Sequence, residues 1–274
     1  MIKAFMLMHP QSAILAGKNA FKSKKVDLRK ISCGTSKVKG ADLSEAADFH
    51  PTYAAMNSCL FETSVILTLW EHADELIGND NIAVLHSDIT INGTAGKVWG
   101  RLDGMLEDNP NEPVALTIPN TFAGLWNDWM VSDNHMLKPK YDPYKIHCFD
   151  NGIFVWDLIK KYDSDLYEFA FDEQPDMIYA HQFACSKAVF EDLGSNLYKI
   201  VRSLRLRDIG FWTPHMFERM IALYLAKQGS PRLTTAFLHY QSSGVYGPGD
   251  HSLYGPRPLK YYHAVSKHAR AGNS

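Results

Sequence analysis

The sequence predicts an α/β protein with a mostly parallel sheet flanked by helices. Short apolar runs that fit buried strands alternate with longer segments whose apolar residues recur at helical spacing. The chain has 274 residues, of which 46% are hydrophobic and 12% aromatic, and this is enough for a well-packed core. We therefore expect one domain over residues 1–274. The Gly-, Pro- and Tyr-rich tail from about residue 244 is expected to be flexible or ordered by docking.

The expected strands and helices follow one another in a regular order. Apolar runs predict strands at residues 2–8, 82–88, 114–118, 177–183 and 233–240. Helical spacing predicts helices at residues 50–77, 96–106, 153–162, 167–171, 187–206 and 214–228. Residues 10–45 are polar and basic, and we expect a loop-rich connection with one or two short elements. Residues 119–143 are too irregular for one element, which is typical of a binding loop or lid.

The composition predicts a cytoplasmic protein without a membrane span. No segment approaches 18 consecutive apolar residues. The apolar start lacks the basic region of a signal peptide, so it is interpreted as a strand. The four cysteines are widely spaced and show no zinc-site spacing, and we expect them to be reduced thiols.

Positive charge gathers in one segment of a chain whose formal net charge is −2. Residues 18–39 contain eight basic residues and one acidic residue. One interpretation is an ordinary solvated surface, which is common for such runs. The other is a surface that binds a polyanion, either a diphosphate, an acidic glycan or a nucleic acid.

The strand expected at residues 82–88 ends on His86, Ser87 and Asp88. A carboxylate at the carboxyl end of a central strand points into the crevice where open α/β sheets bind ligands. Magnesium is commonly bound by one or two carboxylates together with the phosphate oxygens of a substrate. A lone Asp in this position is also common as a turn or helix-capping residue. Asp88 is the candidate ligand for a metal ion and for the phosphates of a nucleotide-linked substrate, the donor. His86 is a candidate contact to the same donor beside it.

Two more histidines are candidates for the same site. His9 follows the first expected strand, where a nucleotide would dock, although it could equally be a turn residue before Pro10. His239 lies in a late apolar segment and is the candidate second metal ligand. The alternative for His239 is a core or edge histidine whose hydrogen bonds are satisfied within the protein.

Candidate catalytic residues come from two other expected elements. His181 lies near the end of the strand at residues 177–183, which is a common place for a base or an acceptor contact. Glu218 is a second catalytic candidate, and the adjacent Arg219 could neutralise a phosphate of the donor. The alternative is a buried ion pair between Glu218 and Arg219 that fixes their helix.

The irregular segment supplies candidates for acceptor binding. Trp126, Asp128 and Trp129 fall within four positions, and aromatic rings stack on sugar faces or on bases. These side chains could also simply anchor the loop. The sequence contains no P-loop or dinucleotide-binding glycine motif, and it has no GxSxG or HExxH motif.

Three stretches resemble, in the same order, a family of bacterial capsular-polysaccharide-type glycosyltransferases with a GT-A-like fold. Residues 57–70 are similar to that family's Asn…Glu…Trp helix, and residues 82–88 are similar to the strand that follows it and ends in His. Residues 207–224 are similar to its late Gly-Phe…Glu-Arg helix. After this His the family usually shows Tyr-Arg-Arg, whereas this chain has Ser87, Asp88 and Ile89. The difference makes a metal-binding Asp more explicit here and leaves a shared substrate open.

The resemblance implies a transferase that moves a sugar from a nucleotide-diphospho-sugar, with a UDP-sugar as first expectation, to a saccharide. Such enzymes use Mn²⁺ or Mg²⁺, here expected on Asp88 and His239, and often carry an Asp-x-Asp pair whose first position is His86 in this chain. One alternative is a DNA glycosyltransferase that modifies a hydroxymethylated base in phage-type DNA, with residues 18–39 holding phosphates. A second alternative is a non-catalytic nucleotide-sugar or glycan-binding protein.

Overall fold

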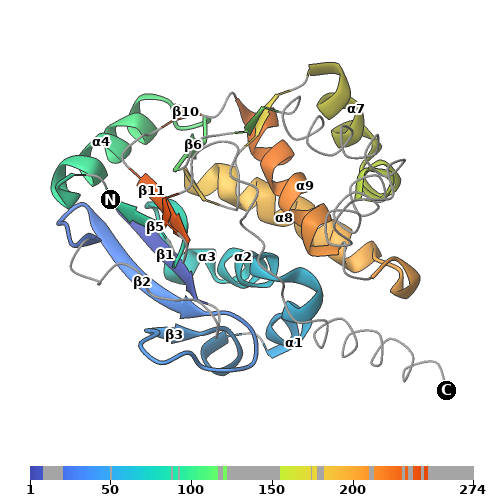
Figure 1. The fold of residues 1–274 in the computed structure, drawn as a ribbon, viewed down its shortest axis with the longest axis horizontal. Coiled ribbons are helices and arrows are strands. Elements are labelled where there is room, and N and C mark those ends of the chain that lie inside the picture. Colours follow the sequence, from blue (N-terminus) through green and yellow to red (C-terminus); the bar gives the residue numbers. More distant parts are fainter. Residues whose placement is uncertain are drawn as a thin grey trace.

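A computed structural model describes residues 1–8, 21–49, 51–87, 89–91, 93–116, 120–121, 155–173, 175–177, 182–209, 213–229, 232–233, 237–241 and 244–245. These residues form an α/β fold in which a central sheet is covered by helices on both faces (Figure 1). The predicted α/β class is therefore confirmed. Within the described residues, no helix is both long enough and apolar enough to cross a bilayer.

The central sheet is mixed rather than simply parallel. Its order is β10-β6-β9-β4-β1-β2-β3. The strands are β1 (Ile2–Met8), β2 (Val26–Ser32), β3 (Leu43–Ser44), β4 (Asn81–His86), β6 (Val114–Ala115), β9 (Phe183–Cys185) and β10 (Arg232–Leu233). Among these strands, β9 is antiparallel to both its neighbours, β4 and β6, and the other pairs are parallel.

The order of the strands reverses beside β1. The chain proceeds from β1 to β2 and β3 on one side, and then places β4 on the other side of β1. The carboxyl ends of β1 and β4 therefore lie side by side, with Leu7 in register with His86. In open α/β sheets this reversal leaves a crevice outside the strand ends, and ligands bind there.

Helices cover both faces of the sheet (Figure 1). One face packs on α4 (Ala95–Asp108), whose Trp99 and Leu102 join a core with Met6 and Leu85. The other face packs on a larger helical layer. Its helices are α1 (Pro51–Leu60), α2 (Glu62–Glu71), α3 (Ala73–Leu76), residues 155–162, α7 (Ser164–Glu173), α8 (Lys187–Ser203) and α9 (Thr213–Gln228). Because β1 and β4 are buried on both faces, their sequences are continuous apolar runs.

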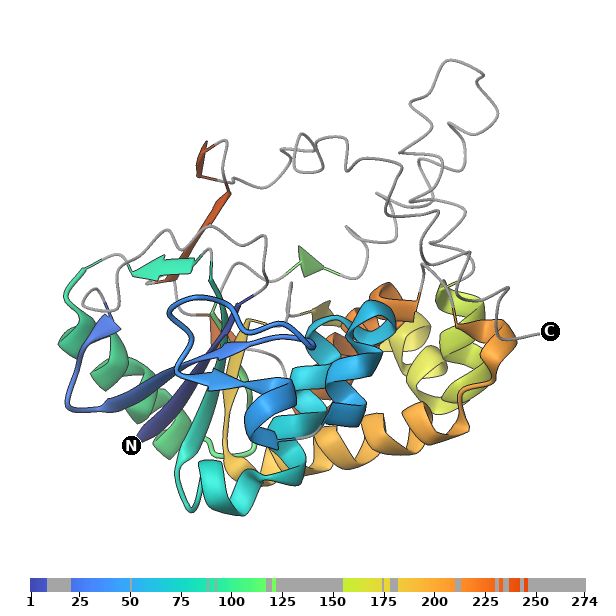
Figure 2. The ribbon, with the colours of Figure 1, turned by 90° about the horizontal axis from the view of Figure 1, so that it is seen from below.

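Two small sheets accompany the central one. One contains β5 (Ile89–Ile91), β11 (Phe237–Gln241) and β12 (Gly244–Val245), in the order β12-β11-β5. Figure 2 shows β5 and β11 beyond the carboxyl ends of the central strands, away from the N-terminus. The other pairs β7 (Asn120–Thr121) with β8 (Asp176–Met177).

Several predicted elements need correction. The segment at residues 10–45 contains β2, a seven-residue strand of the central sheet, and not just short elements. The single helix expected at residues 50–77 is divided into α1, α2 and α3. The first break falls at Phe61, whose φ is 47°, and the Asn57 side-chain amide donates to the Phe61 carbonyl at 2.8 Å. The strand expected at residues 177–183 contributes to β8 and β9, and that at residues 233–240 contributes to β10 and β11.

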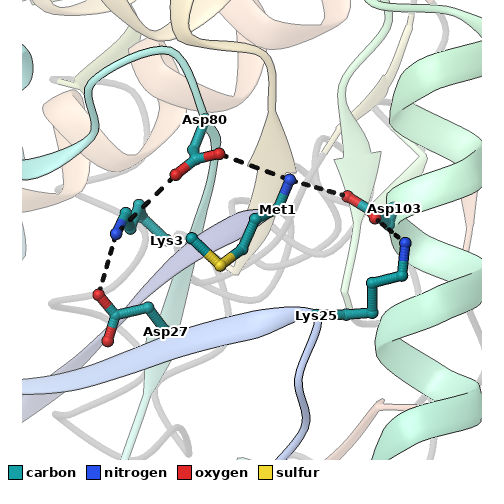
Figure 3. Close-up of polar contacts among 6 residues, drawn as sticks. All are labelled: Met1, Lys3, Lys25, Asp27, Asp80 and Asp103. Atoms are coloured by element: carbon teal, nitrogen blue, oxygen red, sulfur yellow. Dashed lines mark hydrogen bonds and ion pairs between the residues drawn. The ribbon is translucent and has the colours of Figure 1, made fainter.

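Ion pairs connect the residues at the end of the sheet where the parallel strands β1, β2 and β4 begin, which we call the amino edge (Figure 3). The Met1 ammonium lies 3.5 Å from Asp80, before β4, and 3.6 Å from Asp103, on α4. Lys25 reaches the other oxygen of Asp103 at 3.1 Å, and Lys3 lies 3.1 Å from Asp27 of β2. These contacts tie the starts of β1, β2 and β4 to α4.

Candidate functional site

The candidate site lies at the end of the sheet where the parallel strands β1 and β4 finish, which we call the carboxyl edge. β1 ends at Met8 and β4 at His86, and the following Ser87 is 4% exposed. His9 and Asp88 come directly after these stretches in the sequence but lie outside the described residues. Two strand ends that the sequence separates by almost eighty positions thus meet at the reversal of strand order.

His239 is brought to the same edge by the pairing of β11 with β5. This antiparallel pair places His239 in register with Ile89, the residue that follows Asp88 in the sequence. β5 is attached to the α4 side of the sheet through Ile91, which packs against the core on that side. The His239 backbone therefore lies opposite Ile89, whereas Asp88 and the His239 side chain lie outside the described part of the structure.

His86 is held by the sheet itself. It lies on the same face of β4 as Ile82 and Val84, which join the core on the side of the large helical layer. Its ring is half-buried, and its Nε2 atom is fully covered. A half-buried imidazole at a strand end is placed to contact a ligand through its exposed part.

A buried carboxylate that sequence reasoning missed supports the turn after β2. Glu45 is fully buried, and its Oε2 accepts the backbone N–H of Gly34 at 2.6 Å. The Thr68 hydroxyl of α2 lies 3.4 Å from its other oxygen. Gly34 has φ of 77°, and an added Cβ would lie 3.2 Å from the Asn57 side chain. A single Glu in a polar segment carries no local signal of this role, because its partners come from β2 and α2.

Glu218 and Arg219 lie in α9, within the helical layer. Their side chains, 19% and 11% exposed, pair with each other, and His215 lies 3.7 Å from Glu218. α9 packs against α1, α2, α7, α8 and β8. This arrangement favours the structural alternative, an ion pair within the helix, for these two residues.

The remaining predicted contacts cannot be placed. His181, Trp126, Asp128 and Trp129 lie outside the described residues, as do His9 and Asp88. Within the described part of the chain, no group of three or more His, Cys, Asp or Glu side chains could hold a metal ion. A carboxylate from Asp88 with an imidazole from His239 would leave positions open for phosphate oxygens and water, which suits Mn²⁺ or Mg²⁺.

The basic segment is not one continuous surface. Lys25 is paired with Asp103, Arg29 lies 3.3 Å from Asp27, and Lys30 is 7% exposed. Besides Lys25, four lysines in the described part of the segment are exposed: Lys22, Lys24, Lys37 and Lys39. The first two precede β2 and the last two follow it, so they lie toward opposite edges of the sheet.

Comparison with known proteins gives no family. The chain matches no protein-family model, no curated protein and no solved structure.

Proposed function

We propose that this protein is a glycosyltransferase with a GT-A-like fold, which transfers a sugar from a nucleotide-diphospho-sugar, UDP-linked first, to a saccharide. The observation that carries the proposal is the meeting of three chain segments at the reversal of strand order. The ends of β1 and β4 are in register at Leu7 and His86, and His239 is in register with Ile89. These segments carry His9, His86, Asp88 and His239 in sequence, a set that suits a nucleotide and a divalent cation.

Each residue has a proposed role at this edge. Asp88 and His239 would hold Mn²⁺ or Mg²⁺, which when bound supplies positive charge against the departing diphosphate. His9 and His86 would contact the nucleotide and its ribose. In the transfer, the acceptor oxygen bonds to the anomeric carbon while the bond from that carbon to the diphosphate oxygen breaks. The acceptor proton passes to a base on the protein.

His181 is the better candidate for that base. It precedes Gln182 and β9 in the sequence, and β9 is the antiparallel strand that begins where β4 and β6 end. Glu218, in contrast, is engaged with Arg219 and lies near His215. Arg219 is correspondingly less suited to a donor phosphate.

A donor panel tests the proposal. UDP-, GDP- and CMP-sugars with Mn²⁺ are scored by thermal shift and by release of free nucleotide. Binding at a hundredfold excess over Kd adds about 2.7 kcal/mol to stability, which raises Tm by roughly 5–10 °C for a chain of this length. No shift with any donor would count against the whole scheme. A shift without nucleotide release at any metal concentration, with saccharide acceptors present, would indicate a binding protein instead.

DNA remains the alternative acceptor, for which Lys37 and Lys39, exposed after the end of β2, are candidate phosphate contacts. Each phosphate contact contributes a slope of about −0.9 to the plot of log K against log salt concentration. Binding of hydroxymethylated duplex DNA that falls steeply with salt would select DNA. A saccharide acceptor predicts little dependence on salt.

A further inference from the structure

One row of side chains crosses the α4 side of the sheet near its carboxyl edge. Lys30 of β2 is in register with Met6 of β1, and Met6 is in register with Leu85 of β4. Continuing the β4–β9 register from Val84 and Phe183 brings Gln182 opposite Leu85. Met6 and Leu85 belong to the core under α4. The two ends of this row are therefore polar, and its centre is apolar.

Gln182 ends the row as a buried amide. The residue is 0% exposed, and its backbone carbonyl accepts the N–H of Leu116 at 3.0 Å. Neither its Nε2 nor its Oε1 has a hydrogen-bond partner within the described part of the chain. Leaving such a group unsatisfied costs about 1–3 kcal/mol. An uncompensated cost beside a ligand edge is typical of a group that is satisfied by the ligand.

Lys30 ends the row on the other side as a largely buried lysine. It is 7% exposed, and its contacts with Asp42 are made by the Lys30 backbone N–H and carbonyl, at 2.9 and 2.8 Å. No carboxylate of the described residues forms an ion pair with its ammonium, whereas Lys25, five residues earlier, is paired with Asp103. A lysine ammonium without a carboxylate among the described residues can take a ligand phosphate as its partner.

We propose that Lys30 and Gln182 are donor contacts, with Lys30 binding a phosphate and Gln182 binding a hydroxyl of the transferred sugar. This inference rests on the proposed function and adds two residues to its site. Lys30 and Gln182 are separated by three strand spacings, about 14 Å, which is comparable to the length of a diphosphate and a sugar ring lying beyond the strand ends. Gln182 immediately precedes β9, at the level where β4 and β6 approach their carboxyl ends.

Apolar replacements of matched shape test the two contacts. Gln182→Met and Lys30→Met remove the polar ends, and Lys30→Gln is a second, uncharged variant. Thr63→Val is the control for Gln182, because Thr63 of α2 is also 0% exposed and its Oγ1 has no partner among the described residues. Lys25→Met is the control for Lys30, because it removes a lysine of the same segment at the amino edge.

Affinities for the nucleotide-sugar and for its nucleoside diphosphate separate the roles. Gln182→Met should weaken the nucleotide-sugar about tenfold and leave the nucleoside diphosphate unchanged. Both Lys30 variants should weaken the two ligands alike, by about 10- to 100-fold. Both control variants should bind both ligands as the wild type does. Gln182→Met and Thr63→Val should keep or raise Tm, because each removes an unsatisfied group.

Two results would overturn the inference alone. If Gln182→Met and both Lys30 variants bind the nucleotide-sugar with wild-type affinity, the inference is wrong, and the proposed function is unaffected. A fall in Tm of several degrees in Gln182→Met, without one in Thr63→Val, would make the amide a structural group. Failure of the wild-type protein to bind any nucleotide-sugar would instead overturn the proposed function, and this inference with it.

Discussion

The amino and carboxyl edges of the central sheet differ in whether their polar groups have partners. At the amino edge, the Met1 ammonium, Lys3 and Lys25 are matched to Asp27, Asp80 and Asp103 (Figure 3). At the carboxyl edge, β4 ends at His86, and the buried Gln182 amide has no hydrogen-bond partner among the described residues. Matched charges stabilise the fold. Polar groups left unmatched reduce stability and are retained where a ligand completes them.

The largest expected effect is a loss of activity without a loss of stability, caused by substitution of Asp88 at the carboxyl edge. Asp88→Ala should reduce sugar transfer by about 100-fold or more, because metal stabilisation of the leaving group amounts to several kcal/mol. Its Tm should stay within about 2 °C of the wild-type value. The measurements are nucleotide release with Mn²⁺ and a thermal melt. Unchanged turnover in this variant would remove Asp88 from the site.

A substitution at the amino edge should have the opposite effect, a loss of stability without a loss of donor affinity. The side chain of Asp103 is 3% exposed and faces both the Met1 ammonium and Lys25. Asp103→Asn should lower the free energy of unfolding by about 1–3 kcal/mol, since it removes the carboxylate partner of Lys25 and leaves the Met1 ammonium with Asp80 alone. Denaturant melts give this value, and donor affinity should be unchanged. A loss of donor affinity with intact stability would erase the distinction between the edges.

A smaller effect comes from pH at the amino edge. The hydrogen bond to Asp103 raises the pKa of Lys25 above its ordinary value of 10.5. A raised pKa in the folded state gives stability that is fully present below the unfolded value and is lost as pH rises through the folded value. The difference in Tm between the wild type and Lys25→Met should therefore be constant from pH 7 to 9 and shrink above about pH 10.5. A difference that shrinks below pH 9 would assign the effect to another group.

The sequence correctly predicted the elements in which most residues are buried, namely β1, β4 and α9. β1 and β4 are continuous apolar runs because both of their faces are covered, and the helix at residues 214–228 shows a regular apolar stripe that matches α9. β2 was missed because its first four residues are half-buried and include Asp27 and Arg29, which pair with each other. Local pattern shows such residues as polar and cannot show that they are paired inside a sheet.

The site was predictable in its residue types but not in its assembly. A strand ending in His86, Ser87 and Asp88 marks a ligand edge from sequence alone, because strand ends in α/β sheets face the crevice. The register of His239 with Ile89 joins segments 150 residues apart, and nothing local to either segment specifies it. The reversed direction of β9, and with it the position of Gln182, likewise depends on tertiary packing.

Hydrogen exchange with a bound nucleotide-sugar tests the central claim most directly, namely that the ligand lies at the carboxyl edge. The account predicts slower amide exchange in peptides covering residues 83–91 and 237–241, and no change in peptides covering residues 77–81 and 101–108. Protection confined to the amino-edge peptides or to the helical layer, with residues 83–91 and 237–241 unchanged, would contradict it.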